Sequence, residues 1–89
     1  MVNSVITSSQ VRAARSLLGW SAEDLAERAG LHRATIQRLE RRKGAVRAHT
    51  ATLDAVLTVF DAVGIEFISE NGTVGVVHNI DAISHDPSE

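Results

Sequence analysis

The feature that most constrains the fold is a segment of twenty residues, SAEDLAERAGLHRATIQRLE, which occupies positions 21–40. Its apolar side chains recur at helical spacing on both sides of Gly30, so we expect two short helices joined by a tight turn. Gly30 suits the left-handed backbone position that ends a helix. Ala26 is small enough for the second helix to cross close above the first. The segment therefore predicts two helices in close contact.

The two expected helices have distinct inner and outer surfaces. The apolar contact between them comes from Leu25, Ala29, Ile36 and Leu39. The second helix begins near His32 or Arg33 and ends around Lys43–Gly44, and its outer surface is polar and mostly basic. The side chains of this surface are Arg33, Thr35, Gln37, Arg38, Arg41, Arg42 and Lys43. Such a surface suits a groove of duplex DNA.

The stretch from Gln10 to about Gly64 resembles the Xre/Cro-like family of helix-turn-helix regulators, the group that includes phage repressors. The residues that carry the resemblance are Arg15, Gly19-Trp20-Ser21, Leu25-Ala26, Ala29-Gly30-Leu31, Ala34-Thr35-Ile36 and Leu39-Glu40. The chain departs from the family pattern at Ala22, where Gln is frequent, and at His32, where a small cap residue is common. The resemblance implies a mainly α, four-helix repressor-like domain that binds DNA as a dimer.

Candidate DNA-reading residues lie at the start and on the outer face of the second helix, namely Arg33, Ala34, Gln37 and Arg38. The resemblance places Arg33, Ala34 and Arg38 at positions that read bases in phage repressors. We expect the arginines to bind guanine, Gln37 adenine and Ala34 a thymine methyl group, with phosphate as the alternative for either arginine. Phosphate contacts that carry no sequence information are expected from Ser21, His32, Thr35, Arg42, Lys43 and Arg47.

Two further residues are expected to act structurally. The resemblance places Arg15 opposite Glu40 as an ion pair. This pair would join the helix that precedes Gly19 to the end of the second helix of the helix-turn-helix, which is the helix that recognises DNA. Glu40 is also the only acid on an otherwise basic helix, where it would repel phosphate if exposed. Trp20 is expected in the core beside the fourth helix. The chain has only three aromatic residues, which disfavours single-strand binding by base stacking.

The charge of the chain is divided between its halves. All nine Lys and Arg residues lie between Arg12 and Arg47, and with four acids they give residues 1–47 a formal charge of +5. Residues 48–89 hold seven acids and no Lys or Arg, a charge of −7. The net charge of −2 therefore does not argue against DNA binding, because binding responds to the local patch. The acidic half should face away from DNA.

Local signals place the other helices. Thr7-Ser8-Ser9-Gln10 has the form of a capping box, and it predicts a first helix through about Leu18 with Val11, Ala14, Leu17 and Leu18 turned inward. Ser21 and Asp24 predict a second capping box. After a loop over residues 45–49, a helix capped near Thr50 and ended by Gly64 carries one apolar stripe. This stripe consists of Leu53, Val56, Leu57, Phe60 and Val63.

Beyond Gly64 the apolar period changes to two. Residues 65–70 and 73–78 flank Asn71-Gly72, a strong hairpin signal. An isolated hairpin is marginal in water, so the strands either fold over the helical core or pair with the hairpin of a second chain. We favour the second option, with an interface formed by Ile65, Phe67, Ile68, Val74 and Val76. The expected organisation is a DNA-binding domain over 1–64, with the helix-turn-helix at 21–43, a dimerisation hairpin over 65–80 and a flexible tail over 81–89.

Other classes of protein are disfavoured. The chain has no cysteine, which excludes disulfides and thiolate metal sites and fits a reducing cytoplasm. No apolar run approaches the roughly 20 residues of a membrane span. No nucleophile motif, phosphate loop or carboxylate pair indicates an enzyme. The histidines at 32, 49, 78 and 85 lack metal-ligand spacing and are expected to be ordinary surface residues, so no metal or other cofactor is expected.

We therefore expect a cytoplasmic, homodimeric transcription regulator of the repressor type that binds double-stranded DNA at a pseudo-palindromic operator. Two alternatives remain open. One is an antitoxin that represses its own operon and uses its acidic half to bind a toxin. The other is an adaptor that acts through protein contact and has no affinity for duplex DNA even at low salt.

Overall fold

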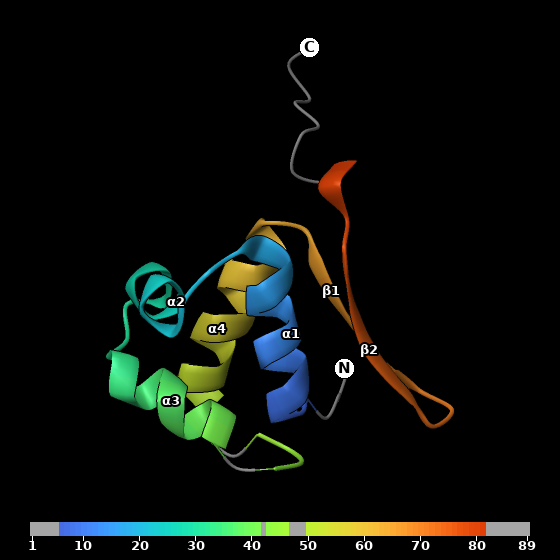
Figure 1. Cartoon of the computed structure of the whole chain (residues 1–89), viewed down its shortest axis with the longest axis horizontal. Helices are drawn as coiled ribbons and strands as arrows, with labels where there is room; N and C mark the ends of the chain where they lie inside the picture. Colours follow the sequence, from blue (N-terminus) through green and yellow to red (C-terminus); the bar gives the residue numbers. More distant parts are fainter. Residues whose placement is uncertain (1–5, 42, 47–49, 82–89) are drawn as a thin grey trace.

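Four helices followed by a two-stranded antiparallel hairpin make up the described part of the chain, which is residues 6–41, 43–46 and 50–81 of a computed structural model (Figure 1). The helices are α1 (Ser8–Leu18), α2 (Ala22–Ala29), α3 (Arg33–Arg41) and α4 (Thr50–Ala62). The strands are β1 (Ile65–Glu70) and β2 (Thr73–His78). The predicted fold class, mainly α with a C-terminal hairpin, is confirmed.

The first two helices begin at reciprocal capping boxes. At α1, Gln10 N donates to Thr7 Oγ1 at 3.1 Å and Thr7 N donates to Gln10 Oε1 at 2.9 Å. At α2, Asp24 N donates to Ser21 Oγ at 3.0 Å and Ser21 N donates to Asp24 Oδ2 at 2.9 Å. These bonds satisfy backbone N–H groups that have no partner within the helix. Both predicted helix starts are confirmed.

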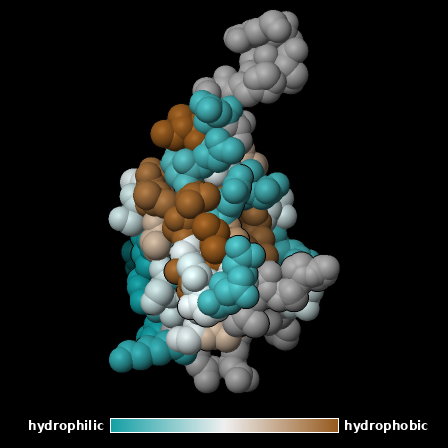
Figure 2. Space-filling model, turned by 90° about the vertical axis from the view of Figure 1, so that its right-hand side faces the viewer, coloured by the Kyte–Doolittle hydropathy of each residue, from teal (hydrophilic) through white to brown (hydrophobic). Residues whose placement is uncertain are grey.

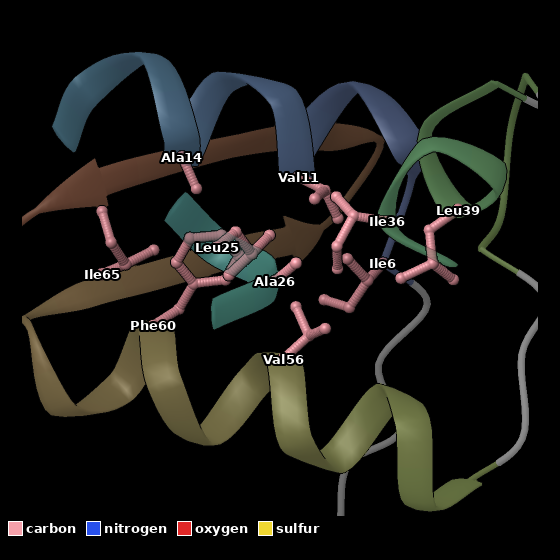
Figure 3. Close-up of a cluster of buried hydrophobic side chains, with 10 residues drawn as sticks. All are labelled: Ile6, Val11, Ala14, Leu25, Ala26, Ile36, Leu39, Val56, Phe60 and Ile65. Atoms are coloured by element: carbon pink, nitrogen blue, oxygen red, sulfur yellow. The ribbon is translucent and has the colours of Figure 1, made fainter. Parts of the chain in front are cut away.

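The core lies between α1 and α4, with α2 and α3 closing one side and the hairpin another (Figure 3). Among the described residues, its buried hydrophobic side chains are those of Ile6, Val11, Ala14, Leu25, Ala26, Ile36, Leu39, Val56, Phe60 and Ile65. The inward prediction is confirmed for Val11 and Ala14, while Leu18 is half-buried. It is wrong for Leu17, which is 49% exposed. Leu17 lies two turns beyond Gln10 on one helical face, and the hairpin covers the Gln10 end of that face but leaves Leu17 open.

Aromatic contacts join α4 to its neighbours. Phe60 is fully buried, and its ring stacks on Trp20 with centroids 6.1 Å apart and an interplanar angle of 17°. Phe67 of β1 meets Phe60 edge to face at 5.6 Å. The predicted core position of Trp20 is confirmed. The apolar stripe of α4 is present, although only Val56 and Phe60 are fully enclosed while its other members are half-buried.

The hairpin has the predicted strands and turn. The register pairs Glu70 with Thr73 and Ile65 with His78, so the connecting loop is Asn71-Gly72. Both loop residues have positive φ, 53° at Asn71 and 77° at Gly72. This is the type I′ geometry, whose twist matches that of the flanking strands.

The hairpin packs on the helices of its own chain, the option we did not favour from the sequence. Ile65 is 3% exposed and belongs to the core, so its prediction as a dimer-interface residue is wrong. Phe67 and Val76 also pack against the core and are half-buried. The inner face of the strands is therefore used within the chain. Of the predicted interface, only the half-buried Ile68 and the exposed Val74 remain outside this packing.

One polar side chain ties the hairpin to α1. Gln10 is 2% exposed, and its Nε2 donates to Ile68 O at 3.0 Å and to Gly75 O at 2.9 Å. Ile68 and Gly75 are paired across the two strands. A single amide thus caps α1 through its oxygen and holds both strands through its nitrogen, so Gln10 fixes where the hairpin sits.

We predict that Gln10→Ala lowers the free energy of unfolding by about 2 kcal/mol, because it removes two buried hydrogen bonds and part of a helix cap. Urea denaturation followed by circular dichroism measures the change. The matched control is Gln37→Ala, at an exposed helical position, which should alter stability by less than about 0.5 kcal/mol. Equal effects of the two substitutions would contradict this role for Gln10.

Candidate nucleic-acid interface

The predicted two-helix unit is present over α2 and α3. Leu25, Ala26 and Ile36 are almost fully buried where the helices meet. Gly30 ends α2 in the left-handed region with φ 70°, and Leu31 N donates to Ala26 O at 2.9 Å to close the turn. A side chain at Gly30 would be strained in this conformation, so glycine is required by the backbone rather than by lack of space. This turn sets the direction in which α3 leaves.

The outer face of α3 carries the predicted base-reading residues together. Arg33, Ala34, Gln37 and Arg38 are all exposed. At 100° per residue they fall within one arc of the helix. Ile36 and Leu39 lie on the opposite side of α3, and Glu40 lies two turns beyond Arg33 at the edge between the two sides; all three are buried. Arg41 is exposed on the same side as Gln37 and Arg38, one turn further along.

The arginines of this face are held only weakly. Arg33 Nη1 lies 3.9 Å from Glu23 Oε1, with both side chains more than 60% exposed. Such a surface pair is worth less than about 1 kcal/mol. Arg38 Nη2 lies 3.5 Å from Thr35 Oγ1, at the limit of a hydrogen bond. Both guanidinium groups can therefore exchange these contacts for a ligand at little cost.

A buried ion pair fixes the inner side of α3. Arg15 Nε donates to Glu40 Oε2 and Arg15 Nη2 to Glu40 Oε1, both at 2.7 Å, and the two side chains are only 19% and 9% exposed. Arg15 Nη1 also donates to Trp20 O at 2.9 Å. The hydrogen bonds to Glu40 raise the pKa of Arg15 above its ordinary value. The predicted pair is thus present in bidentate geometry, and it joins α1, α3 and the segment before α2.

Sequence reasoning missed Arg12 as a second contact from α1 to α3. Arg12 Nη1 donates to Glu40 O, and its Nη2 donates to Ser9 Oγ at 3.1 Å. Glu40 O is one of the last carbonyls of α3, where a cation is favoured by the helix dipole. The spacing of Arg12 and Arg15 could have indicated this contact. The two residues lie three positions apart and so on one face of the helix, where both can reach α3.

The N-terminus of α2 is less free to bind phosphate than the sequence indicated. The capping box already uses Ser21 N and Ser21 Oγ as partners of Asp24. The Ser21 N–H and hydroxyl lower the pKa of Asp24, so its carboxylate adds negative charge there, beside Glu23. Phosphate binding by Ser21 stays a prediction.

The other phosphate candidates lie around α3. His32 is exposed at the start of the helix, and its carbonyl accepts from Thr35 N at 2.9 Å. Thr35 itself is half-buried. Lys43 is exposed next to Gly44, whose carbonyl accepts from Ser8 N at 3.0 Å and so holds this segment against the start of α1. Arg42 and Arg47 lie outside the described residues.

The division of charge along the sequence is also a division in space. The basic helix α3 lies at the lower left of Figure 1, and the hairpin lies on the opposite side, at the right. The exposed acids of the C-terminal half that the structure describes are Asp54, Asp61, Glu66, Glu70 and Asp81. They belong to α4, to β1 and to the end of the hairpin, so the outer face of α3 is left predominantly basic.

All four histidines were expected to be ordinary surface residues, and the two that the structure describes differ from each other. His32 is exposed as expected, but His78 is half-buried and its Nε2 lies 3.1 Å from Val63 O. The prediction of an ordinary surface residue is therefore wrong for His78, which links the end of β2 to the end of α4. His49 and His85 lie outside the described residues, as does most of the tail predicted at 81–89.

No cluster of three or more metal-ligating side chains occurs in the part of the chain that the structure describes. Within the same residues, none of the helices combines the length and the apolar character that crossing a bilayer requires.

Comparison with known proteins agrees with this geometry. The family model described as Helix-turn-helix matches residues 11–64, which is more than half of the 89-residue chain. The match spans α1 to α4 and ends at Gly64, as the resemblance from Gln10 to about Gly64 predicted. No curated protein matches the chain.

We predict that Arg15→Ala lowers the free energy of unfolding by about 3 kcal/mol, because it leaves the Glu40 carboxylate buried without a partner. The double variant Arg15→Met with Glu40→Leu should be more stable than Arg15→Ala, since it buries no unpaired charge. Thermal and urea denaturation measure both. Arg33→Ala, which breaks the exposed pair with Glu23, is the control and should change stability by less than about 0.5 kcal/mol. A double variant less stable than Arg15→Ala would contradict the argument.

Proposed function

This chain belongs to the Xre/Cro-like helix-turn-helix family, and from that premise we propose that it is a sequence-specific transcriptional repressor acting as a homodimer. The family match supports a DNA-binding transcriptional regulator. The specificity, the repressor action and the dimer are our proposals. The observation that carries them is the single exposed arc of α3, which holds two arginines, a glutamine and an alanine.

We assign base reading to this arc on chemical grounds. The major groove of B-DNA admits one helix, and each base pair presents a distinct set of donors, acceptors and methyl groups there. Arg33 and Arg38 can each donate two hydrogen bonds to a guanine, and Gln37 can pair with an adenine. Ala34 lies between them with a methyl group suited to a thymine methyl. All four side chains are exposed and none packs in the core, so the arc can contact bases without a rearrangement of the fold.

A second set of residues would hold the backbone of the duplex. Lys43 and His32 flank α3 at its two ends, with Thr35 and the Ser21 hydroxyl nearby, and we include Arg42 and Arg47 from the sequence. Each phosphate neutralised by a cation adds about 0.9 to the magnitude of the salt slope. These contacts would position α3 in the groove without selecting a sequence.

We propose that the dimer forms through the outer face of the hairpin. Apolar surface gathers on this side of the molecule (Figure 2). Ile68, Gly75 and Val77 share the face of the sheet opposite to Phe67. Val77 is 42% exposed, and Leu17 and Ile80 are other exposed apolar residues of α1 and of the chain after β2. A two-stranded sheet also has free edges, which readily pair with another strand. Half-sites would then lie about 10 bp apart or at a multiple of that spacing.

The first experiment for this function is fluorescence anisotropy with a duplex from the region upstream of the gene and a scrambled duplex. We predict preference for the upstream duplex and a steep salt dependence. Arg38→Ala and Arg33→Ala should each weaken binding to the preferred duplex by about 2 kcal/mol, roughly 30-fold, with less effect on the scrambled one. Lys43→Ala should weaken binding to both duplexes alike.

Arg28→Ala is the matched control, because it removes the same charge from α2, where Arg28 lies 4.4 Å above the Trp20 ring and away from the arc. It should leave the preference between the duplexes unchanged. Absence of any affinity for duplex DNA at low salt would contradict the proposal and favour the protein adaptor.

The dimer has its own test. Sedimentation equilibrium should give a dimer for the natural chain and a monomer for Val77→Glu, because the change removes apolar contact from the outer face and places a second carboxylate opposite Glu66. The control is Ala51→Glu, at an exposed position in the first turn of α4. A Val77→Glu variant that still dimerises as tightly as the control would contradict this interface.

A further inference from the structure

An open groove lies between α4 and β1, and nothing in the proposed DNA contact uses it. Its volume is about 700 Å³. Apolar side chains of Leu57, Ile65 and Phe67 line it, together with the carboxylates of Asp54, Asp61 and Glu66. We call it the α4–β1 groove. Its volume is of the size that binds a small molecule or a few side chains of a partner.

The groove combines an apolar floor with an acidic rim. Ile65 is 3% exposed, and Leu57 and Phe67 are half-buried. Asp54 and Asp61 are seven residues apart, so they lie two turns apart on the same face of α4, with Leu57 and Thr58 between them. Glu66 contributes the third carboxylate from β1. All three acids are exposed.

The rim charge is not neutralised by the described residues. Neither of the ion pairs among those residues involves Asp54, Asp61 or Glu66. The chain has no Lys or Arg beyond position 47, so α4 and the hairpin contribute no cation of their own. A ligand that covers this groove must therefore supply apolar contact and positive charge together.

We propose that the α4–β1 groove binds a basic segment of a second protein, in which apolar side chains are flanked by Lys or Arg. The apolar side chains would cover Leu57 and Phe67 while the cations meet Asp61 and Glu66. Nucleic acid and anionic surfaces are repelled by the same rim. A second copy of this chain fits less well. Its Lys and Arg residues all lie between Arg12 and Arg47, so the residues that bound this groove would no longer be free to contact DNA.

This partner site is separate from the recognition helix. No residue of α3 lines the groove, so the partner and DNA can occupy the protein at the same time. The inference goes beyond the proposed function, because it assigns a protein-binding surface that needs no DNA. Binding at this site can therefore be tested in an assay that contains no DNA.

The test is fluorescence anisotropy of a labelled short peptide in which leucine and arginine alternate, titrated with the full chain. We expect saturable binding of one peptide per chain and no binding of the peptide with glutamate in place of arginine. The double variant Asp61→Asn with Glu66→Gln should weaken binding about fivefold, because it removes two exposed charge pairs. Thr58→Trp, which fills the groove from the exposed face of α4, should weaken binding at least as much.

The matched control is Glu70→Gln with Asp81→Asn, two exposed acids that do not line the groove and whose loss changes the net charge equally. It should leave the affinity unchanged. An equal loss in this control would show only diffuse attraction and would overturn the proposal, as would the absence of peptide binding. Self-association of the natural chain that Thr58→Trp abolishes would also overturn it, because the occupant would then be a second copy.

Discussion

The arrangement of the helices depends on the contact between Arg15 and Glu40. A carboxylate as enclosed as Glu40 is unfavourable unless a cation and good hydrogen-bond geometry compensate for its lost hydration. Arg15 provides both oxygens with partners at 2.7 Å and uses its third nitrogen on Trp20 O. Because Glu40 faces α1 together with the buried Ile36 and Leu39, the side of α3 that holds Ala34, Arg38 and Arg41 must face solvent. The exposure of the basic face is thus a consequence of a buried charge.

Much of this fold could be predicted because its signals are local. The capping boxes are complete within four residues, and Asn71-Gly72 determines its turn through backbone geometry alone. The pairing of Arg15 with Glu40 came from the family resemblance. The position of the hairpin could not be predicted, since it depends on Gln10 reaching carbonyls 58 and 65 residues away. Alternating apolar residues indicate that one face of a strand is covered, but they do not identify what covers it.

The division of charge gives the two sides of the molecule different chemistry, and we propose a different partner for each. Basic residues gather where α3 would approach phosphate, and the acids of α4 and β1 lie away from it. In our proposal the acidic side helps to orient the protein on DNA by repulsion, and the α4–β1 groove offers charge and apolar contact to a basic protein segment. These 89 residues can in this way present two chemically distinct surfaces.

The role of α3 in DNA binding is tested most directly by an NMR titration of the ¹⁵N-labelled chain with a short duplex from the region upstream of its gene. We expect the largest amide shifts to cluster at the start of α3 and around Lys43, while the amides of α4 and β1 change little. Shifts concentrated in the hairpin or in α4, with the α3 amides unchanged, would contradict the assignment of the exposed arc of α3 as the DNA interface.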